Sequence, residues 1–114
     1  MKPLKFKALL KTTIWGGEEV TKLKNLMDAP RQVGESWEIS GVPGNETLVC
    51  CGPEQGSTLE QLIEKHGAEL VGKKNLERYG TTFPLLIKFI SAAQDLSIQV
   101  RPDDAMAQRM GRPY

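Results

Sequence analysis

The chain has 114 residues, a length typical of one domain, so we expect residues 1–114 to form a single domain. Hydrophobic residues make up 39% and charged residues 25%, which excludes a disordered chain. A formal charge of +1 argues against a dedicated nucleic-acid-binding protein and a polybasic membrane module. No apolar run approaches the roughly 18 residues of a membrane span, and residues 1–11 lack the apolar stretch of a secretory signal, so we expect a cytoplasmic protein.

The two cysteines, Cys50 and Cys51, are neighbours in the sequence. A disulfide between adjacent residues would be strained, and no C-x-x-C spacing accompanies them. We therefore expect two small buried side chains at the end of a strand, since free cysteine usually packs as a small apolar residue.

Hydrophobic periodicity predicts the elements of the first half of the chain. In order, these are a strand that begins with the alternation over residues 4–8, a short helix over 18–27, and two strands over 37–39 and 47–51. Gly16 and Gly17 should end the first strand. The segment 41–45, rich in glycine and proline, predicts a turn that joins the other two strands into a hairpin.

The second half begins with a capped helix. Ser57 and Glu60 have the spacing of a capping box, and Gly67 should end the helix that follows. The elements predicted after it are a short helix over 68–71, strands over 85–90 and 96–100, and a helix capped by Asp103 that extends to about Arg109. Strands dominate and their connections suit antiparallel pairing, so the fold class is mostly β or α+β, with short helices inserted.

Two polar features interrupt the later strands. Lys88 lies within an apolar run, where a lysine either extends along an edge to solvent or points into a polar pocket. Ser97, Gln99 and Arg101 alternate with apolar residues and would share one strand face. If the two strands pair antiparallel, Lys88 falls beside this row. That face is either solvated or suited to an anion such as a sugar phosphate.

The remaining candidates are weaker. His66 is the only histidine and lies in the last turn of the predicted helix, where a partly charged imidazole is favourable. Trp15 and Trp37 are expected in the core. The sequence contains no phosphate-binding loop, dinucleotide fingerprint, H-E-x-x-H motif or usable Ser/His/Asp set.

Four segments change these expectations when they are taken together. They are TIWGG, VGESWEISG, FPLLIKFI and QDLSIQVRPDD. In their order and spacing they resemble type I mannose-6-phosphate isomerase, the zinc-dependent phosphomannose isomerase family of the cupin superfamily. The resemblance covers nearly all of this chain but only the N-terminal part of a family member, which is several-fold longer. It implies a partial cupin-type β-jelly roll and a reaction that interconverts mannose 6-phosphate and fructose 6-phosphate.

The resemblance also implies roles for individual residues. The family reaction is understood as proton transfer between C1 and C2 through an enediol, with zinc polarising the substrate oxygens. Lys88 and Ser97 match active-site residues of the family, while Trp15, Glu35 and again Lys88 match substrate contacts or pocket walls. Gln99 matches the first zinc ligand of the family's S-I-Q-x-H-P strand.

The second ligand position of that strand is occupied here by Arg101, and the family's remaining ligands lie beyond Tyr114. Arginine stays protonated, has no lone pair to donate, and would repel the ion. One amide oxygen does not make a zinc site. We therefore expect that this chain alone neither binds zinc nor catalyses the reaction.

Three hypotheses follow. The first is that the chain is the N-terminal portion of a mannose-6-phosphate isomerase. The second is a metal-free remnant that binds a sugar phosphate through Lys88 and Arg101. The third is an assembly segment that self-associates, because part of a jelly roll leaves strand edges and apolar faces exposed. None of the three involves nucleic acid or a membrane.

Overall fold

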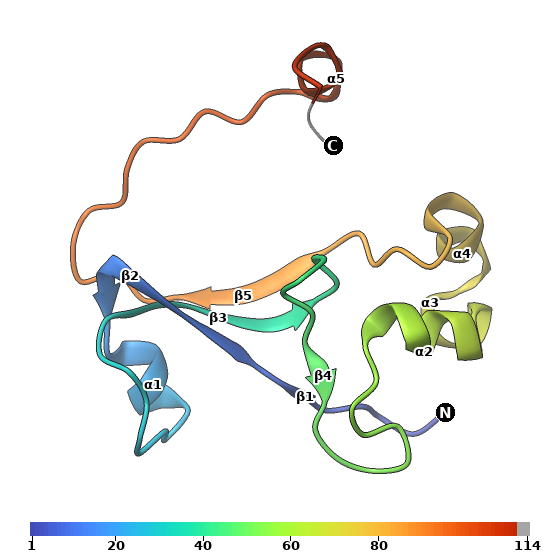
Figure 1. Ribbon diagram of the computed structural model, residues 1–114, viewed down its shortest axis with the longest axis horizontal. Helices are drawn as coiled ribbons and strands as arrows, with labels where there is room; N and C mark the ends of the chain where they lie inside the picture. Colours follow the sequence, from blue (N-terminus) through green and yellow to red (C-terminus); the bar gives the residue numbers. More distant parts are fainter. Residues whose placement is uncertain (112–114) are drawn as a thin grey trace.

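The computed structural model describes residues 1–111 as short strands and helices around a small sheet (Figure 1). The strands are β1 (Phe6–Lys7), β2 (Leu9–Gly17), β3 (Val33–Ser40), β4 (Leu48–Val49) and β5 (Leu86–Ile90). The helices are α1 (Glu19–Leu23), α2 (Leu59–His66), α3 (Ala68–Val71), α4 (Lys73–Tyr79) and α5 (Asp104–Arg109). The expected α+β class with antiparallel strands is confirmed. None of the described helices is long and apolar enough to cross a lipid bilayer.

Strand β3 is the centre of the main sheet, whose order is β2-β3-β5, and both neighbours run antiparallel to it. A second, two-stranded sheet pairs β1 with β4. The hairpin predicted from residues 37–39 and 47–51 is therefore wrong in its pairing, because β2 and β5 occupy both edges of β3 and leave none for β4. Thr47 stays bonded to β3, since its amide donates to the Ser40 carbonyl at 3.0 Å and its hydroxyl accepts from the Ser40 amide at 2.9 Å.

Strand β2 includes Gly16 and ends at Gly17, so the glycine pair ends the strand as predicted. The glycines allow it to cross β3 at very short range. A Cβ added at Gly16 would lie 2.2 Å from the Gln32 carbonyl oxygen and 2.6 Å from the Gly34 nitrogen. Register shifts along β2 accompany this crossing. The glycine pair thus serves close packing inside the strand.

Helix α2 is capped at both ends. Thr58 accepts a hydrogen bond from the Gln61 amide at 3.2 Å, and the Gln61 side chain accepts one from the Thr58 amide at 3.0 Å. The capping box predicted for Ser57 and Glu60 is thus displaced by one residue. Gly67 ends the helix as predicted. Helix α3 is also confirmed, whereas α4 was not predicted.

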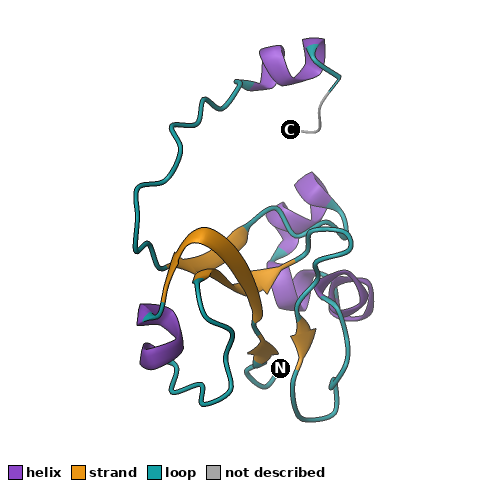
Figure 2. Ribbon diagram, turned by 60° about the vertical axis from the view of Figure 1, so that its left-hand side comes forward, coloured by secondary structure: helices purple, strands orange, loops and turns teal. Residues whose placement is uncertain are grey.

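The core is small and has two parts. Leu62 and Ile63 are buried on α2, whereas Val20 of α1 and Val33 of β3 are buried where that helix packs against the sheet. Helix α1 lies at the opposite end of the main sheet from α2, α3 and α4 (Figures 1 and 2). Strand β5 is an edge of the sheet and leaves apolar side chains in solvent, since Phe89 is 48% and Ile90 54% exposed.

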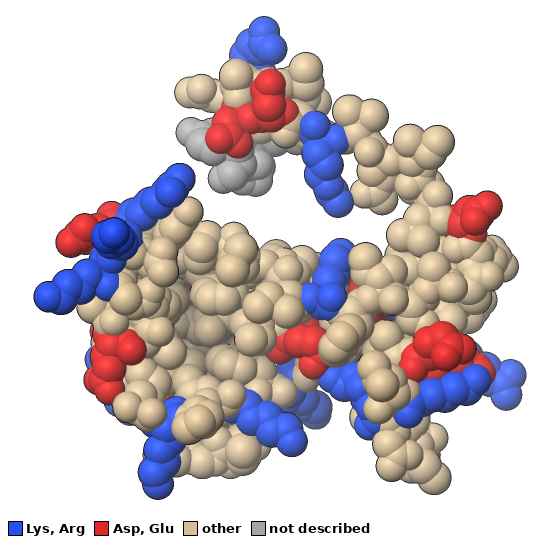
Figure 3. Space-filling model, turned by 180° about the vertical axis from the view of Figure 1, so that it is seen from behind, with Lys and Arg blue, Asp and Glu red and all other residues tan. Residues whose placement is uncertain are grey.

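Residues 94–103, which we call the arm, contain no strand. The strand predicted over 96–100 is wrong, and Ile98 and Val100 are 98% and 91% exposed. Alternation produces a strand only where a neighbouring strand supplies the hydrogen bonds. The arm arches away from the sheet to α5, which Asp103 caps as predicted (Figures 1 and 3). The radius of gyration is accordingly 16.5 Å, against about 13 Å for a compact chain of this length.

Candidate functional site

Four polar or aromatic side chains gather on one face of the main sheet, and we call them the Lys88 cluster: Lys11, Glu35, Trp37 and Lys88. Glu35 and Trp37 are two residues apart on β3 and therefore share a face. Lys88 of β5 lies opposite Trp37, and Lys11 of β2 lies opposite Glu35. The pairing register of β2, β3 and β5 thus brings the four side chains together on one face of the sheet.

Glu35 holds the cluster together. Its Oε1 accepts a hydrogen bond from Lys88 Nζ at 2.8 Å, and its Oε2 accepts one from Trp37 Nε1 at 2.6 Å. Lys11 Nζ lies 4.6 Å from the centroid of the Trp37 ring, a cation–π contact, and also donates to Asn45. All of these residues are half-buried, so their contacts are partly shielded from water.

The cluster combines one carboxylate with two ammonium groups. Burial opposes the ionisation of Glu35, but hydrogen bonds from Lys88 and Trp37, together with the nearby positive charges, outweigh it and lower the pKa of Glu35. The ionised carboxylate orients the Lys88 ammonium. Within residues 1–111 no carboxylate forms an ion pair with Lys11, so the cluster keeps a positive charge and is suited to bind an anion or a polarised oxygen atom.

We expect Glu35→Gln to lower the free energy of unfolding by about 1 kcal/mol at neutral pH, because the amide loses the ionic bond to Lys88. The folded pKa of Glu35 is depressed, so its stabilisation is present above the ordinary pKa of glutamate and disappears as the pH falls through the folded value. Urea unfolding from neutral to acid pH should show parent and variant converging below about pH 4.

Glu77→Gln is the control for this comparison. Glu77 of α4 is exposed and forms no ion pair with the other described residues. Its replacement should leave the unfolding curves unchanged across the pH range. A stability loss in Glu35→Gln that persisted undiminished at the lowest pH would contradict the role assigned to the Glu35 carboxylate.

A second ion pair lies on the other face of β3. Lys24 Nζ is 2.6 Å from Glu38 Oε1, which also accepts a hydrogen bond from the Ser36 hydroxyl at 2.6 Å. Ser36 and Glu38 alternate along β3 with the residues of the Lys88 cluster, so this pair faces away from it. The Lys24–Glu38 pair therefore serves as a reference for an ion pair of similar geometry outside the candidate site.

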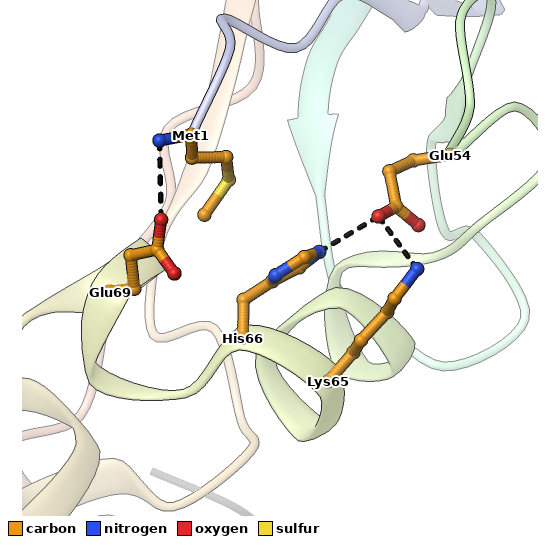
Figure 4. A network of polar contacts seen from close by, with 5 residues as sticks. All are labelled: Met1, Glu54, Lys65, His66 and Glu69. Carbon is orange, nitrogen blue, oxygen red and sulfur yellow. Dashed lines mark hydrogen bonds and ion pairs between the residues drawn. The ribbon is translucent and has the colours of Figure 1, made fainter.

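A third polar network attaches the loop before α2 to that helix (Figure 4). Glu54 Oε1 lies 2.8 Å from both Lys65 Nζ and His66 Nε2, and the Met1 amino group lies 3.2 Å from Glu69. Hydrogen bonds from Lys65, and next from His66, lower the pKa of Glu54. The observed contacts of His66 thus hold the loop against the helix.

Among the residues predicted for the site, Lys88 and Glu35 are brought into direct contact. Trp15 lies elsewhere: a Cβ added at Gly34 would lie 2.8 Å from the Trp15 ring. Because Gly34 and Glu35 point to opposite faces of β3, the Trp15 ring and the Lys88 cluster lie on opposite sides of the sheet.

Two members of the cluster were missed from the sequence. Trp37 was expected in the core, but it stands beside Glu35 with an ammonium group near its ring. The spacing of Glu35 and Trp37 could have indicated their shared face. Nothing in the sequence could have indicated Lys11, because its position depends on the register of β2 against β3.

Ser97, Gln99 and Arg101 lie on the arm, and all three are exposed. The predicted pairing that would bring this row beside Lys88 is wrong, because no strand forms over residues 96–100. Within the row, Arg101 Nη2 donates a hydrogen bond to Gln99 Oε1 at 3.2 Å. The structure therefore does not bring the arm residues and the Lys88 cluster together.

These arm residues do not fit a zinc ion. The amide oxygen of Gln99 already accepts from Arg101, whose guanidinium has no lone pair and repels a cation. Within residues 1–111, no three His, Cys, Asp or Glu side chains stand close enough together to hold a metal. A structural or catalytic zinc site needs three or four protein ligands, so the arm has too few.

Known proteins resemble this chain over almost its whole length. Residues 4–112 match the family described as phosphomannose isomerase type I, catalytic domain. Mannose-6-phosphate isomerase ManA of Bacillus subtilis is 39% identical over 105 residues, which cover 92% of this chain and 31% of ManA. The probable mannose-6-phosphate isomerase GmuF of the same organism is 34% identical over 106 residues, which cover 93% of this chain and 32% of GmuF.

The fold of this chain also resembles that of a mannose-6-phosphate isomerase. A crystal structure of mannose 6-phosphate isomerase from Bacillus subtilis matches with a TM-score of 0.80 and 33% sequence identity, over 96% of this chain and 33% of that one. The chain thus spans about a third of the length of the relatives that it matches. Sequence and fold agree over that third, and the chain belongs to the type I phosphomannose isomerase family.

Proposed function

We propose that this chain supplies the N-terminal third of a mannose-6-phosphate isomerase. Family membership and the fold match along nearly the whole chain support this proposal. In that protein the two open sheets are part of a cupin-type jelly roll, whose other strands come from the remaining two thirds of the fold. The proposed reaction interconverts mannose 6-phosphate and fructose 6-phosphate by proton transfer between C1 and C2.

The contact between Lys88 and Glu35 is the observation that carries the proposal. Proton transfer through an enediol places negative charge on a substrate oxygen. The Lys88 ammonium, oriented by the carboxylate at 2.8 Å, donates a hydrogen bond to that oxygen and stabilises the charge. Ser97 is proposed as the second catalytic residue, and Trp15 and Glu35 as substrate-binding residues.

The 114-residue chain by itself is proposed to be inactive. Gln99 is the one residue that the family resemblance assigns to a metal-ligand position, and here its amide oxygen is bonded to Arg101. Zinc supplies polarisation of the substrate oxygens in the family, and its other ligands must come from outside the described residues. Turnover of mannose 6-phosphate by the purified chain would contradict this proposal.

The role of Lys88 can be tested in a chimera. Residues 4–112 replace the matching segment of Bacillus subtilis ManA and carry Arg101→His. We expect Lys88→Ala to lower kcat/KM for mannose 6-phosphate by on the order of 10²–10³-fold, because an oriented charge on the developing oxyanion is lost. A coupled assay for fructose 6-phosphate measures the rate.

Lys24→Ala is the matched control. The Lys24–Glu38 and Lys88–Glu35 pairs have N–O distances of 2.6 and 2.8 Å and similar burial, but they lie on opposite faces of β3. Lys24→Ala should cost similar stability and leave kcat/KM nearly unchanged. Equal losses of activity in the two variants would show that Lys88 acts only through stability, and would remove it from the catalytic residues.

Self-association is a second candidate function, favoured by the open edge of β5. Among the strands that the structure describes, β5 has a partner on one side only, and Ile87, Phe89 and Ile90 are about half exposed. An unpaired, apolar strand edge accepts a strand from another chain. The proposed partner is a second copy of this chain, and a strictly monomeric mass by light scattering over a range of concentrations would exclude it.

The hypothesis of a metal-free sugar-phosphate binder loses its geometric support. It requires the charges of Lys88 and Arg101 on one face, but Lys88 is paired with Glu35 and Arg101 lies on the arm. The structure therefore favours the isomerase and self-association proposals over this alternative.

A further inference from the structure

The adjacent thiols of Cys50 and Cys51 form a feature that the proposed function does not use. The expectation of two buried side chains is wrong for Cys51, which is exposed, while Cys50 is half-buried. Both are free thiols, and their sulfur atoms lie 3.8 Å apart. They directly follow β4, which belongs to the two-stranded sheet, whereas Lys88 lies on β5 of the main sheet.

The backbone around the two cysteines is held on both sides. The Cys50 amide donates to the Lys5 carbonyl at 2.9 Å, which attaches it to the segment leading into β1. The loop that follows closes on itself, because the Gly56 amide donates to the Val49 carbonyl at 2.9 Å. Glu54 then joins this loop to α2 (Figure 4). The thiols are thus presented on a backbone with little freedom.

We propose that Cys50 and Cys51 chelate an exchangeable soft divalent metal ion of the kind of Zn²⁺ or Cd²⁺ with two protein ligands, which differs from a structural or catalytic zinc centre with its three or four. Sulfur ligands favour such ions over hard ones such as Mg²⁺. Two Zn–S bonds of about 2.3 Å at a tetrahedral angle place their sulfur atoms about 3.8 Å apart. The two thiols already have this separation, so chelation requires almost no movement of the chain.

Metal binding fits this geometry better than a disulfide does. A disulfide would bring the sulfur atoms to about 2.05 Å, between Cα atoms that a trans peptide holds about 3.8 Å apart, below the usual disulfide range. It would also require an oxidant. In chelation each S–H bond releases its proton, two sulfur–metal bonds form, and two water molecules leave the ion. The other coordination positions stay with solvent.

The test is a titration of the reduced full chain with Cd²⁺. Binding is followed by the ultraviolet charge-transfer band from sulfur to metal, and native mass spectrometry gives the stoichiometry. We expect one ion per chain, with the mass of the ion added and two protons lost. Cys50→Ser and Cys51→Ser should each weaken binding by on the order of 10²-fold, because each variant keeps only one of two linked ligands.

His66→Gln is the matched control, since His66 contacts the same loop and imidazole is the other side chain there that binds such ions. It should leave the affinity for Cd²⁺ unchanged, and excess Mg²⁺ should not displace the ion. The proposal is overturned if either serine variant binds as tightly as the parent, if the double variant still takes up Cd²⁺, or if His66→Gln loses as much affinity as a cysteine variant. Circular dichroism verifies that the variants are folded.

Discussion

Arg101→His in the chimera with Bacillus subtilis ManA is expected to raise the affinity for zinc. The increase should exceed the roughly 10–100-fold effect of a residue that only hydrogen-bonds to a zinc ligand. A neutral imidazole donates a lone pair to zinc, whereas a guanidinium has none and carries a like charge. The substitution also releases the Gln99 amide oxygen, which now accepts from Arg101 at 3.2 Å. Zinc content after dialysis against a chelator measures the affinity, and isomerisation of mannose 6-phosphate should increase with it.

Arg101→Ala separates the two effects of this substitution. Alanine removes the positive charge and the hydrogen bond to Gln99 but adds no ligand, so it should recover only a small part of the zinc affinity. If alanine restored as much zinc as histidine, or if the chimera with Arg101 already bound a full equivalent, residue 101 would not occupy a ligand position.

Gly16→Ala is expected to destabilise the protein by about 2–3 kcal/mol. The added methyl group would meet the Gln32 carbonyl and the Gly34 nitrogen at 2.2 and 2.6 Å, and both are backbone atoms of the segment entering β3 and of β3 itself. Backbone in a sheet cannot move aside without breaking its ladder, so β2 and β3 would separate at the crossing. The free energy of unfolding in urea measures the loss.

Gly17→Ala is the neighbouring control. A methyl group there would meet the Ser91 hydroxyl at 3.0 Å and the Ala93 side chain at 3.6 Å, which are contacts that a small adjustment of side chains relieves. We expect its cost to be well below that of Gly16→Ala. Equal destabilisation by the two variants would mean that loss of glycine flexibility, and not the close crossing of β2 and β3, accounts for the effect.

Features that depend on neighbours in the chain were predictable from the sequence. Gly67 ends α2, and Asp103 caps α5, because each acts on a backbone group a few residues away. The cap of α2 was displaced by one residue because Ser57 and Thr58 are equally suitable hydroxyl donors and acceptors. The prediction of a strand over 96–100 was wrong. Alternation of polar and apolar residues indicates which face of a strand would be buried, but not whether a partner strand is present.

The candidate site was predictable in its residues but not in its arrangement. Lys88 and Glu35 were named through the family resemblance, and the structure adds that they form an ion pair across 53 residues of sequence. That contact depends on the register between β3 and β5, which contains a shift near Trp37. Register follows from pairing and packing of whole strands, so no local pattern could have placed the arm residues away from Lys88.

The order of strands in the main sheet has a consequence for folding during synthesis. Strands β2 and β3 leave the ribosome first, and a two-stranded ribbon is only marginally stable alone. Strand β5 emerges after α2, α3 and α4, and its pairing with β3 must close the long intervening loop, which slows the step. The contact between Lys88 and Glu35 forms in that same step, so assembly of the candidate site coincides with completion of the three-stranded sheet.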